Sequence, residues 1–223
     1  MILKSGSISA IVGAIVLMVA TMLHPMGVNP GDPIAAFTEY AADKLWVASH
    51  LGQFLSVGLI FVGLYGLSRS LRNDAIEWVA NLGLLIALAA LVLAAVLQAI
   101  DGVALKVMVD RWAVATDAQK QSAFDAAFAV RQIEIGAASF TAILFGTAGI
   151  LFGISLTASP LYPMWLGWLA IVGGTGTAVG GLVTAFTGFS VAAMNLAMPF
   201  NFIMIVWIAL TGALMWRQAD GTK

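Results

Sequence analysis

The sequence predicts an all-α integral membrane protein, folded as a six-transmembrane-helix bundle. Three observations lead to this fold class: hydrophobic residues make up 61% of the 223 positions, charged residues make up only 9%, and the mean hydropathy is +0.99. A soluble domain carries roughly 25% charged residues, so this composition cannot cover a surface that faces water. We therefore expect residues 1–223 to form a single transmembrane helical domain whose first partner is the lipid bilayer.

Six apolar segments are long enough to cross a membrane. A spanning helix needs about 20 mostly apolar residues, and it must satisfy its own backbone hydrogen bonds in lipid. The predicted spans cover residues 7–24, 46–68, 78–104, 134–157, 163–187 and 191–215. Lys4 precedes the first span, as in a signal peptide, but no small-residue cleavage site comes before His24, so we expect this helix to be retained. A run of small residues at 173–181 predicts a close contact between the fifth helix and a neighbour.

The connections predict that the end of the bundle opposite the termini is the more elaborate one. Residues 25–45 form a long loop there, and residues 106–131 have helical spacing, with Asp117 expected as a helix N-cap. The third and fourth helices should therefore extend beyond the bilayer as a hairpin. Phe124 and Phe128 would pack this hairpin against the 25–45 loop, which would act as a lid.

Basic and aromatic residues indicate how the bundle sits in the membrane. Lys and Arg are equally numerous on the two sides, but Arg69 and Arg72 lie in a very short loop, where positive charge marks the cytoplasmic side most strongly. We expect both termini in the cytoplasm of a bacterial-type plasma membrane. Most of the seven tryptophans fall near predicted helix ends, as in an aromatic belt at the membrane interface.

Charge, cysteine content and motifs exclude several function classes. The formal net charge is −1 and no basic surface is available, so nucleic acid is not an expected partner. Cysteine is absent, which excludes disulfides, thiolate metal sites and a cysteine nucleophile. The chain has no Walker loop, Gly-x-Ser-x-Gly elbow or kinase motif set, and no motif identifies a family.

Polar side chains gather at one predicted depth, near the end opposite the termini. His24 ends the first span, His50 lies about one turn into the second, Asp101 lies near the end of the third and Glu134 near the start of the fourth. An imidazole or carboxylate turned toward lipid would be desolvated without a partner. We therefore expect these four side chains to converge on one ligand site. Three further polar residues should support it from a similar depth: Gln98, Arg131 and Asn195.

Several chemistries fit this set of side chains. His24, His50, Asp101 and Glu134 are a sufficient ligand set for a transition metal such as zinc, iron or manganese. The two histidines alone could hold a heme, and methionines near His24 would suit Cu(I). The structural alternative is that these residues touch interfacial water while Arg131 forms a salt bridge to one of the carboxylates.

Three function classes remain open. The leading one is a binding or redox protein with an outward-facing polar cup for a metal, heme, quinone or lipid-like ligand. The second is a non-catalytic accessory or self-associating scaffold subunit of a membrane complex. The third is a small transporter, although the half of the bundle near the termini carries little polarity beyond Asn81 and threonines of the fifth span. A hydrophobic small molecule, a second copy of the chain and a membrane complex are the candidate partners, and enzymatic activity stays open.

Overall fold

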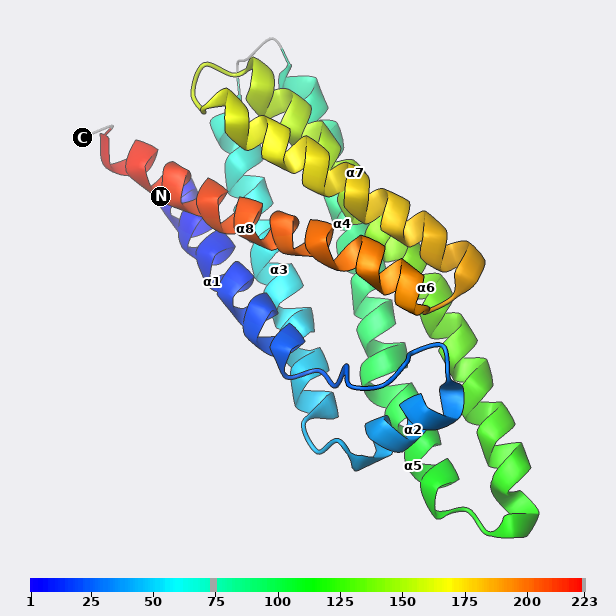
Figure 1. Ribbon diagram of the computed structural model, residues 1–223. Coiled ribbons are helices and arrows are strands. Elements are labelled where there is room, and N and C mark those ends of the chain that lie inside the picture. The colour runs from blue at the N-terminus through cyan, green and yellow to red at the C-terminus, as the bar shows by residue number, and fades with distance from the viewer. Residues whose placement is uncertain (73–75, 222–223) are drawn as a thin grey trace.

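The computed structural model describes residues 1–72 and 76–221, and these residues are helical with no strand among them. Six helices are long and apolar enough to span a membrane (Figure 1). They are α1 (Ile2–Met22), α3 (Trp46–Ser70), α4 (Glu77–Ala99) with its continuations η1 (Ile100–Leu105) and α5 (Lys106–Val114), α6 (Asp117–Ala158), α7 (Met164–Thr187) and α8 (Val191–Gly221). The predicted six-helix all-α membrane bundle is confirmed.

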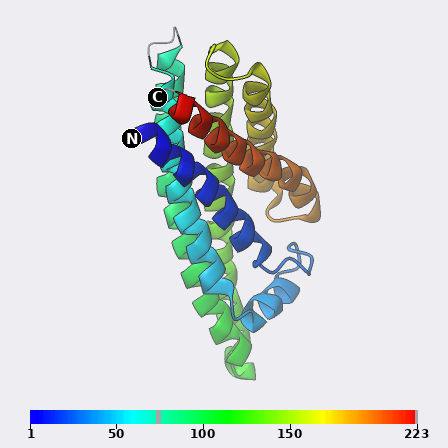
Figure 2. The same cartoon turned by 90° about the vertical axis from the view of Figure 1, so that its left-hand side faces the viewer.

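The spanning helices form a closed ring in chain order. Helix α3 packs between α1 and α4, α6 packs between α4 and α7, and α8 closes the ring by packing against both α7 and α1. Both termini lie at one end of the bundle, and the α5–α6 connection lies at the other (Figures 1 and 2). The ring is filled by a hydrophobic core that includes Phe152 and Trp207.

Small residues bring α6 and α7 into close contact. A Cβ atom added to Gly146 of α6 would overlap the carbonyl oxygen of Gly174 of α7. A Cβ atom added to Gly174 would likewise overlap the carbonyl oxygen of Gly146. Glycine at both positions lets the two backbones approach directly, the usual packing solution between helices in lipid. The predicted close approach by the small-residue run at 173–181 is confirmed.

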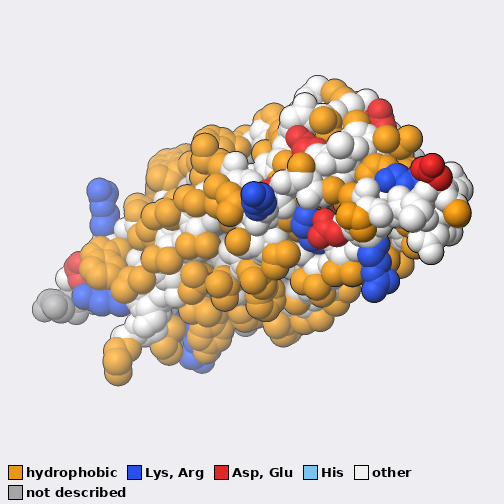
Figure 3. Space-filling model, turned by 90° about the horizontal axis from the view of Figure 1, so that it is seen from below, with side chains coloured by type: hydrophobic (Ala, Val, Ile, Leu, Met, Phe, Trp, Pro, Cys, Tyr) orange, Lys and Arg blue, Asp and Glu red, His pale blue; other side chains and the backbone are white. Residues whose placement is uncertain are grey.

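The third and fourth spans continue well past the thickness of a membrane. Their helical stretches contain 38 and 42 residues, which at about 1.5 Å per residue far exceeds a hydrocarbon core of about 30 Å. Charged side chains gather toward this hairpin end, while hydrophobic side chains cover much of the flanks (Figure 3). The prediction of Asp117 as N-cap is wrong: Thr116 occupies that position in extended conformation, and Asp117 is the first residue of α6.

The 25–45 loop contains a short helix, α2 (Pro33–Ala42), which packs across the hairpin. Asp32 starts it by accepting hydrogen bonds from the amides of Ile34 and Ala35, with Pro33 in the first turn. Phe37 of α2 is fully buried and contacts the rings of Trp112 and Phe124. The predicted packing of this loop against the hairpin is therefore confirmed for Phe124, whereas Phe128 is exposed and stacks on Phe124 instead.

A cation on the hairpin fixes the other end of α2. The ammonium group of Lys106 donates to the carbonyl oxygens of Tyr40 and Ala41, at 2.9 and 3.1 Å, and to Asp110 at 2.8 Å. These carbonyls belong to the last turn of α2, which lacks intrahelical donors and carries a partial negative charge. Lys106 thus joins α2 to the third span at the first residue after η1, the segment that contains Asp101.

Candidate metal centre

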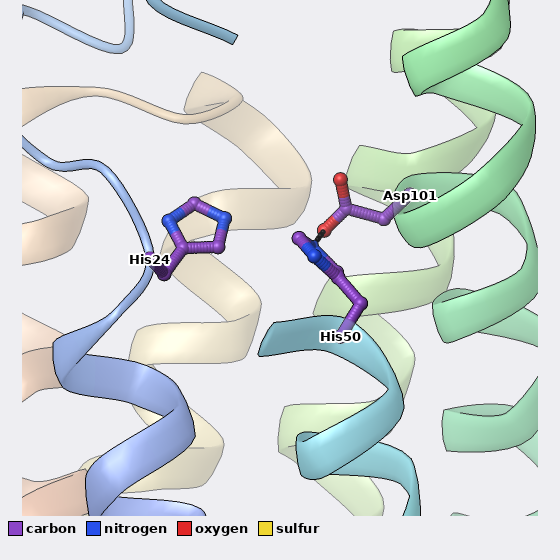
Figure 4. A group of neighbouring side chains, drawn as sticks. All are labelled: His24, His50 and Asp101. Carbon is purple, nitrogen blue, oxygen red and sulfur yellow. Dashed lines mark hydrogen bonds and ion pairs between the residues drawn. The ribbon is translucent and has the colours of Figure 1, made fainter. Parts of the chain in front are cut away.

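Three of the four predicted ligand residues lie together at the end opposite the termini. One ligand atom each of His24, His50 and Asp101 lies within 4.8 Å of the other two. His24 follows the end of α1, His50 lies in the first turns of α3, and Asp101 lies in η1 (Figure 4). Three segments that are far apart in the sequence thus place two imidazoles and a carboxylate around a common point.

His50 is held by both ring nitrogens. It is 2% exposed, its Nδ1 lies 2.6 Å from the carbonyl oxygen of Trp46, and its Nε2 lies 2.9 Å from Oδ2 of Asp101. A carbonyl oxygen only accepts, so Nδ1 carries a proton that it donates to Trp46. In a neutral imidazole Nε2 then presents a lone pair toward a carboxylate oxygen. That arrangement is stable only when a proton or a cation is shared between the two atoms.

His24 is oriented in the same way. Its Nδ1 lies 2.9 Å from the carbonyl oxygen of Pro25 and donates to it, which leaves Nε2 free to act as a ligand. Pro25 lacks an amide hydrogen and disfavours helix at the residue before it, so α1 ends at Met22 and the ring of His24 turns toward His50 and Asp101. Burial lowers the pKa of His24, and the Asp101 carboxylate acts in the opposite direction.

Local irregularity positions Asp101. The third span changes from α-helix to a six-residue π-helix at Ile100, a feature that frequently occurs at functional sites. The indole nitrogen of Trp46 donates to the backbone oxygen of Asp101 at 2.9 Å. While Oδ2 contacts His50, Oδ1 is buried with no hydrogen-bond partner among the described residues.

Trp46 forms an aromatic wall behind both histidines. Its ring centroid lies 4.8 Å from that of His24, 4.6 Å from that of His50 and 4.3 Å from that of Tyr40. Trp46 is 1% exposed, so the interpretation of tryptophans as an interfacial belt is wrong for this residue. Trp78, Trp165 and Trp168 are exposed near helix ends, as that interpretation requires.

Glu134 lies deep in α6 beside this cluster without being one of the three close ligand groups. The side chain is 4% exposed, and Oε2 has no hydrogen-bond partner within the described part of the chain. Glu134 and Asp101 both lie close enough to Tyr40 to act on its hydroxyl. Burial raises the pKa of the Tyr40 hydroxyl, Arg131 opposes this rise, and Glu134 and Asp101 add to it. Glu134 is therefore a buried carboxyl group, with one oxygen unpartnered among the described residues, near a site already rich in acceptors.

Arg131 binds the lid rather than a carboxylate. Its guanidinium donates to the hydroxyl oxygen of Tyr40 at 3.1 Å and to the backbone oxygen of Pro30 at 2.9 Å, and it lies over the ring of Phe189. Within residues 1–72 and 76–221, no ion pair joins Arg131 to Asp101 or Glu134, so the alternative of a structural salt bridge is wrong. Asp101 pairs with His50 instead.

The remaining predicted residues have separate positions. The Gln98 amide nitrogen donates to Oε1 of Gln53 at 3.1 Å, and Gln98 shares a groove wall with His50. Asn195 is exposed on α8, and no hydrogen bond links it to the cluster in the described ranges. Of the methionines considered for copper, Met22 is 75% exposed and Met26 is also exposed, so neither thioether is held against His24.

Four contributors to the site were missed at the sequence level. Tyr40, Trp46 and Gln53 make the contacts described above, and Asp43 acts electrostatically on His24 from the connection between α2 and α3. Oδ2 of Asp43 is buried without a partner among the described residues. The spacing of four between Trp46 and His50 was the available signal, because it places both side chains on one helix face.

Comparisons with known proteins give no further guide. No family model matches the chain, and searches of curated proteins and of solved structures find no match either.

Proposed function

We propose that this integral membrane protein binds a divalent transition metal of the zinc class through His24, His50 and Asp101. The observation that carries the proposal is the orientation of the two imidazoles. Each donates Nδ1–H to a backbone carbonyl, of Pro25 or Trp46. Nε2 of His50 contacts Asp101, and the ring of His24 faces this pair (Figure 4). Histidines that ligate metals almost always make such a second hydrogen bond, which fixes the tautomer and the ring orientation.

The charge balance of the site supports a cation. Buried carboxyl oxygens of Asp43, Asp101 and Glu134 have no hydrogen-bond partner among the described residues, and Nε2 of His50 faces a carboxylate oxygen. The cationic Arg131 is engaged by the lid. A divalent ion would satisfy several of these lone pairs at once and offset the desolvation of the carboxylates.

The distances suit a site that closes around its ion. Zinc bonds of about 2.1 Å place neighbouring tetrahedral ligands about 3.4 Å apart. The ligand atoms here lie within 4.8 Å, and His50 and Asp101 are already 2.9 Å apart. His24 is the member that closes the gap, because it lies outside α1 and is only partly buried. Three protein ligands would leave a fourth position open, as in catalytic zinc sites.

The same packing argues against heme. A bis-histidine heme places its two imidazoles on opposite faces of a porphyrin. Here the centroids of His24 and His50 are 5.1 Å apart, and Trp46 contacts both rings. The indole occupies the position beside both imidazoles where a macrocycle would have to extend.

We further propose that the metal site faces the outside of a bacterial-type plasma membrane, with both termini in the cytoplasm. Arg69 lies in the last turn of α3 and Arg72 follows it, at the end of the bundle that carries the termini. Basic residues in short loops mark the cytoplasmic side. The His24 site lies at the opposite end.

Metal analysis of the purified, detergent-solubilised protein tests the proposal. The wild-type chain should retain one equivalent of zinc after dialysis against buffer and lose it to a chelator. His24→Ala, His50→Ala and Asp101→Asn should each weaken zinc binding by at least about 100-fold, since even outer-shell changes cost 10- to 100-fold. Asn81→Ala, which removes a polar group at the other end of the bundle, is the matched control and should bind zinc as the wild type does.

The alternative has a different outcome. If the wild-type chain binds no zinc and His50→Ala or Asp101→Asn lowers only thermal stability, His50 and Asp101 form a structural imidazolium–carboxylate pair. The scaffold function would then replace the one proposed here.

A further inference from the structure

A groove on the lipid-facing side of the bundle leads to the candidate metal centre. It has a volume of about 270 Å³ and lies between the first two turns of α3 and the end of α4 with η1. Six of the residues that line it are apolar: Val47, Leu51, Phe54, Ala95, Ala99 and Val103. Most of these side chains are exposed at the flank of the bundle, so the groove opens toward the bilayer.

Only two side chains give this groove a polar character. His50 forms part of its wall, and Gln98 stands beside it one turn of α4 before Asp101. The Gln98 amide nitrogen is engaged by Gln53, whereas Oε1 of Gln98 is buried with no hydrogen-bond partner in the described ranges. An acceptor without a donor is costly where lipid replaces water. The groove therefore favours an occupant that brings a hydrogen-bond donor.

The size and depth of the groove restrict the occupant further. Its volume lies below the range of about 300 to 1,000 Å³ that is usual for drug-sized ligands, which suits one extended chain. From Val47 to Phe54 it follows seven residues of α3, a rise of about 10 Å, starting next to the first residue of that helix. A molecule in it would have its polar end near the membrane interface and its tail in the hydrocarbon.

We infer that the groove binds a single-chain amphipath from the bilayer whose hydroxyl group donates to Oε1 of Gln98, an oxygen that is covered in this structure and becomes accessible when the Gln98 side chain rotates. The hydroxyl then lies on the wall that His50 shares with the metal site, so the molecule reaches the centre sideways from the membrane while α2 covers the centre from outside. This last step rests on the proposed function, whereas the groove and its occupant do not. The amphipath is thus the candidate substrate or ligand class for the centre.

Photolabelling in phosphatidylcholine vesicles tests the inference. The probe is a long-chain primary alcohol that carries a diazirine in its chain, and its methyl ether serves as the comparison because it cannot donate a hydrogen bond. After irradiation and digestion, the alcohol should label residues 47–54 and 95–103 above the rest of the lipid-facing surface. The ether should label them about fivefold less, the equivalent of one hydrogen bond of about 1 kcal/mol.

Matched alanine-to-tryptophan variants on α4 identify the groove as the site. Ala99→Trp fills the groove and should abolish the excess labelling, while Ala89→Trp changes an exposed alanine outside the groove and should leave it unchanged. If the probe labels the surfaces around Ala89 and Ala99 equally, and Ala99→Trp does not change this labelling, the probe contacts the protein only as annular lipid. That result would overturn the inference. Equal labelling by alcohol and ether would overturn the assignment of Gln98 as acceptor.

Zinc measured in the same samples separates this inference from the proposed function. Ala99→Trp should lose the label and keep zinc, and His24→Ala should lose zinc and keep the label, because His24 does not line the groove. If His24→Ala keeps zinc while Ala99→Trp loses the label, the metal proposal fails and the groove stands. If His24→Ala loses zinc and Ala99→Trp keeps the label, the groove proposal fails and the metal site stands.

Discussion

The Cα of Gly102 faces the side chain of His50 so closely that a Cβ atom at position 102 would lie 2.5 Å from Cβ of His50. Real Cβ atoms do not approach so closely, so only glycine allows η1 to pass His50 at this distance. Gly102 directly follows Asp101 in the sequence, and the carboxylate of Asp101 is hydrogen-bonded to His50. The absence of a side chain at position 102 is therefore what permits the His50–Asp101 geometry.

Gly102→Ala should displace His50 and weaken both the fold and the proposed metal site. Overpacking of a tight contact costs about 1 to 3 kcal/mol, and the shift would separate Nε2 of His50 from Asp101. Chemical denaturation in detergent and zinc titration measure the two effects. Gly58→Ala on the same helix as His50 is the control, because nothing lies within 4 Å of the added atom; it should be neutral or stabilising by up to about 1 kcal/mol.

Glu134→Gln should weaken zinc binding without destabilising the protein. The substitution replaces a buried carboxyl group, whose Oε2 has no partner among the described residues, by an amide that always brings a hydrogen-bond donor into a site rich in acceptors. We expect a loss of affinity of about tenfold, the lower range for groups that act from outside the ligand shell. Competition with a zinc dye measures it, with the exposed Asp125→Asn as control. A loss of stability with unchanged zinc affinity would show that Glu134 has a purely structural role.

Arg131→Ala should release α2 from the bundle. It removes two hydrogen bonds from a charged donor, to Tyr40 and Pro30, each worth about 1.5 to 3 kcal/mol. Amide hydrogen exchange over residues 33–42 should accelerate. Arg131→Lys should not restore protection, because an ammonium group lacks the planar fork that reaches both oxygens. Arg111→Ala, at an exposed position of α5, should leave the exchange unchanged; equal exchange in all four proteins would contradict this role of Arg131.

Tyr162 should remain protonated well above pH 10. Burial raises the pKa of its hydroxyl, which bonds Ser70 at 2.7 Å, from 10.0 to about 12. Between these values the unfolded chain has released the proton and the folded chain retains it, so stability falls by roughly 1.4 kcal/mol per pH unit as the pH rises. Ultraviolet titration of phenolate should show a step near pH 12 that Tyr162→Phe removes. A wild-type titration that is complete near pH 10 would disprove it.

The orientation of the bundle can be tested by single cysteines, since the chain contains none. Ser122→Cys lies at the exposed hairpin end, and Ala158→Cys lies exposed at the end of α6 near the termini. A membrane-impermeant maleimide should label Ser122→Cys in intact cells and Ala158→Cys only after lysis, if the termini are cytoplasmic. The reverse pattern would place the proposed metal site on the cytoplasmic side.

The six spans, the long hairpin and the packing of the 25–45 loop on it could be predicted from the sequence. These features depend on the length of apolar segments and on helical periodicity, which are both read along the chain. A stretch of about 20 apolar residues spans the hydrocarbon wherever it is, and a helical pattern continued to residue 131 must project beyond it. Even the depth of His24, His50 and Asp101 follows from the rise per residue. Their common level is thus a property of the sequence.

Which side chains meet at that level was decided only by the tertiary structure. Asn195 has a similar depth and is exposed, whereas Asp101 reaches His50 because a π-helical turn and Gly102 set the rotation of the third span. Arg131 turned to Tyr40 and Pro30 because α2 folded over it. Rotation of a helix about its axis depends on how its small and large side chains fit those of its neighbours, and no pattern within one helix contains that information.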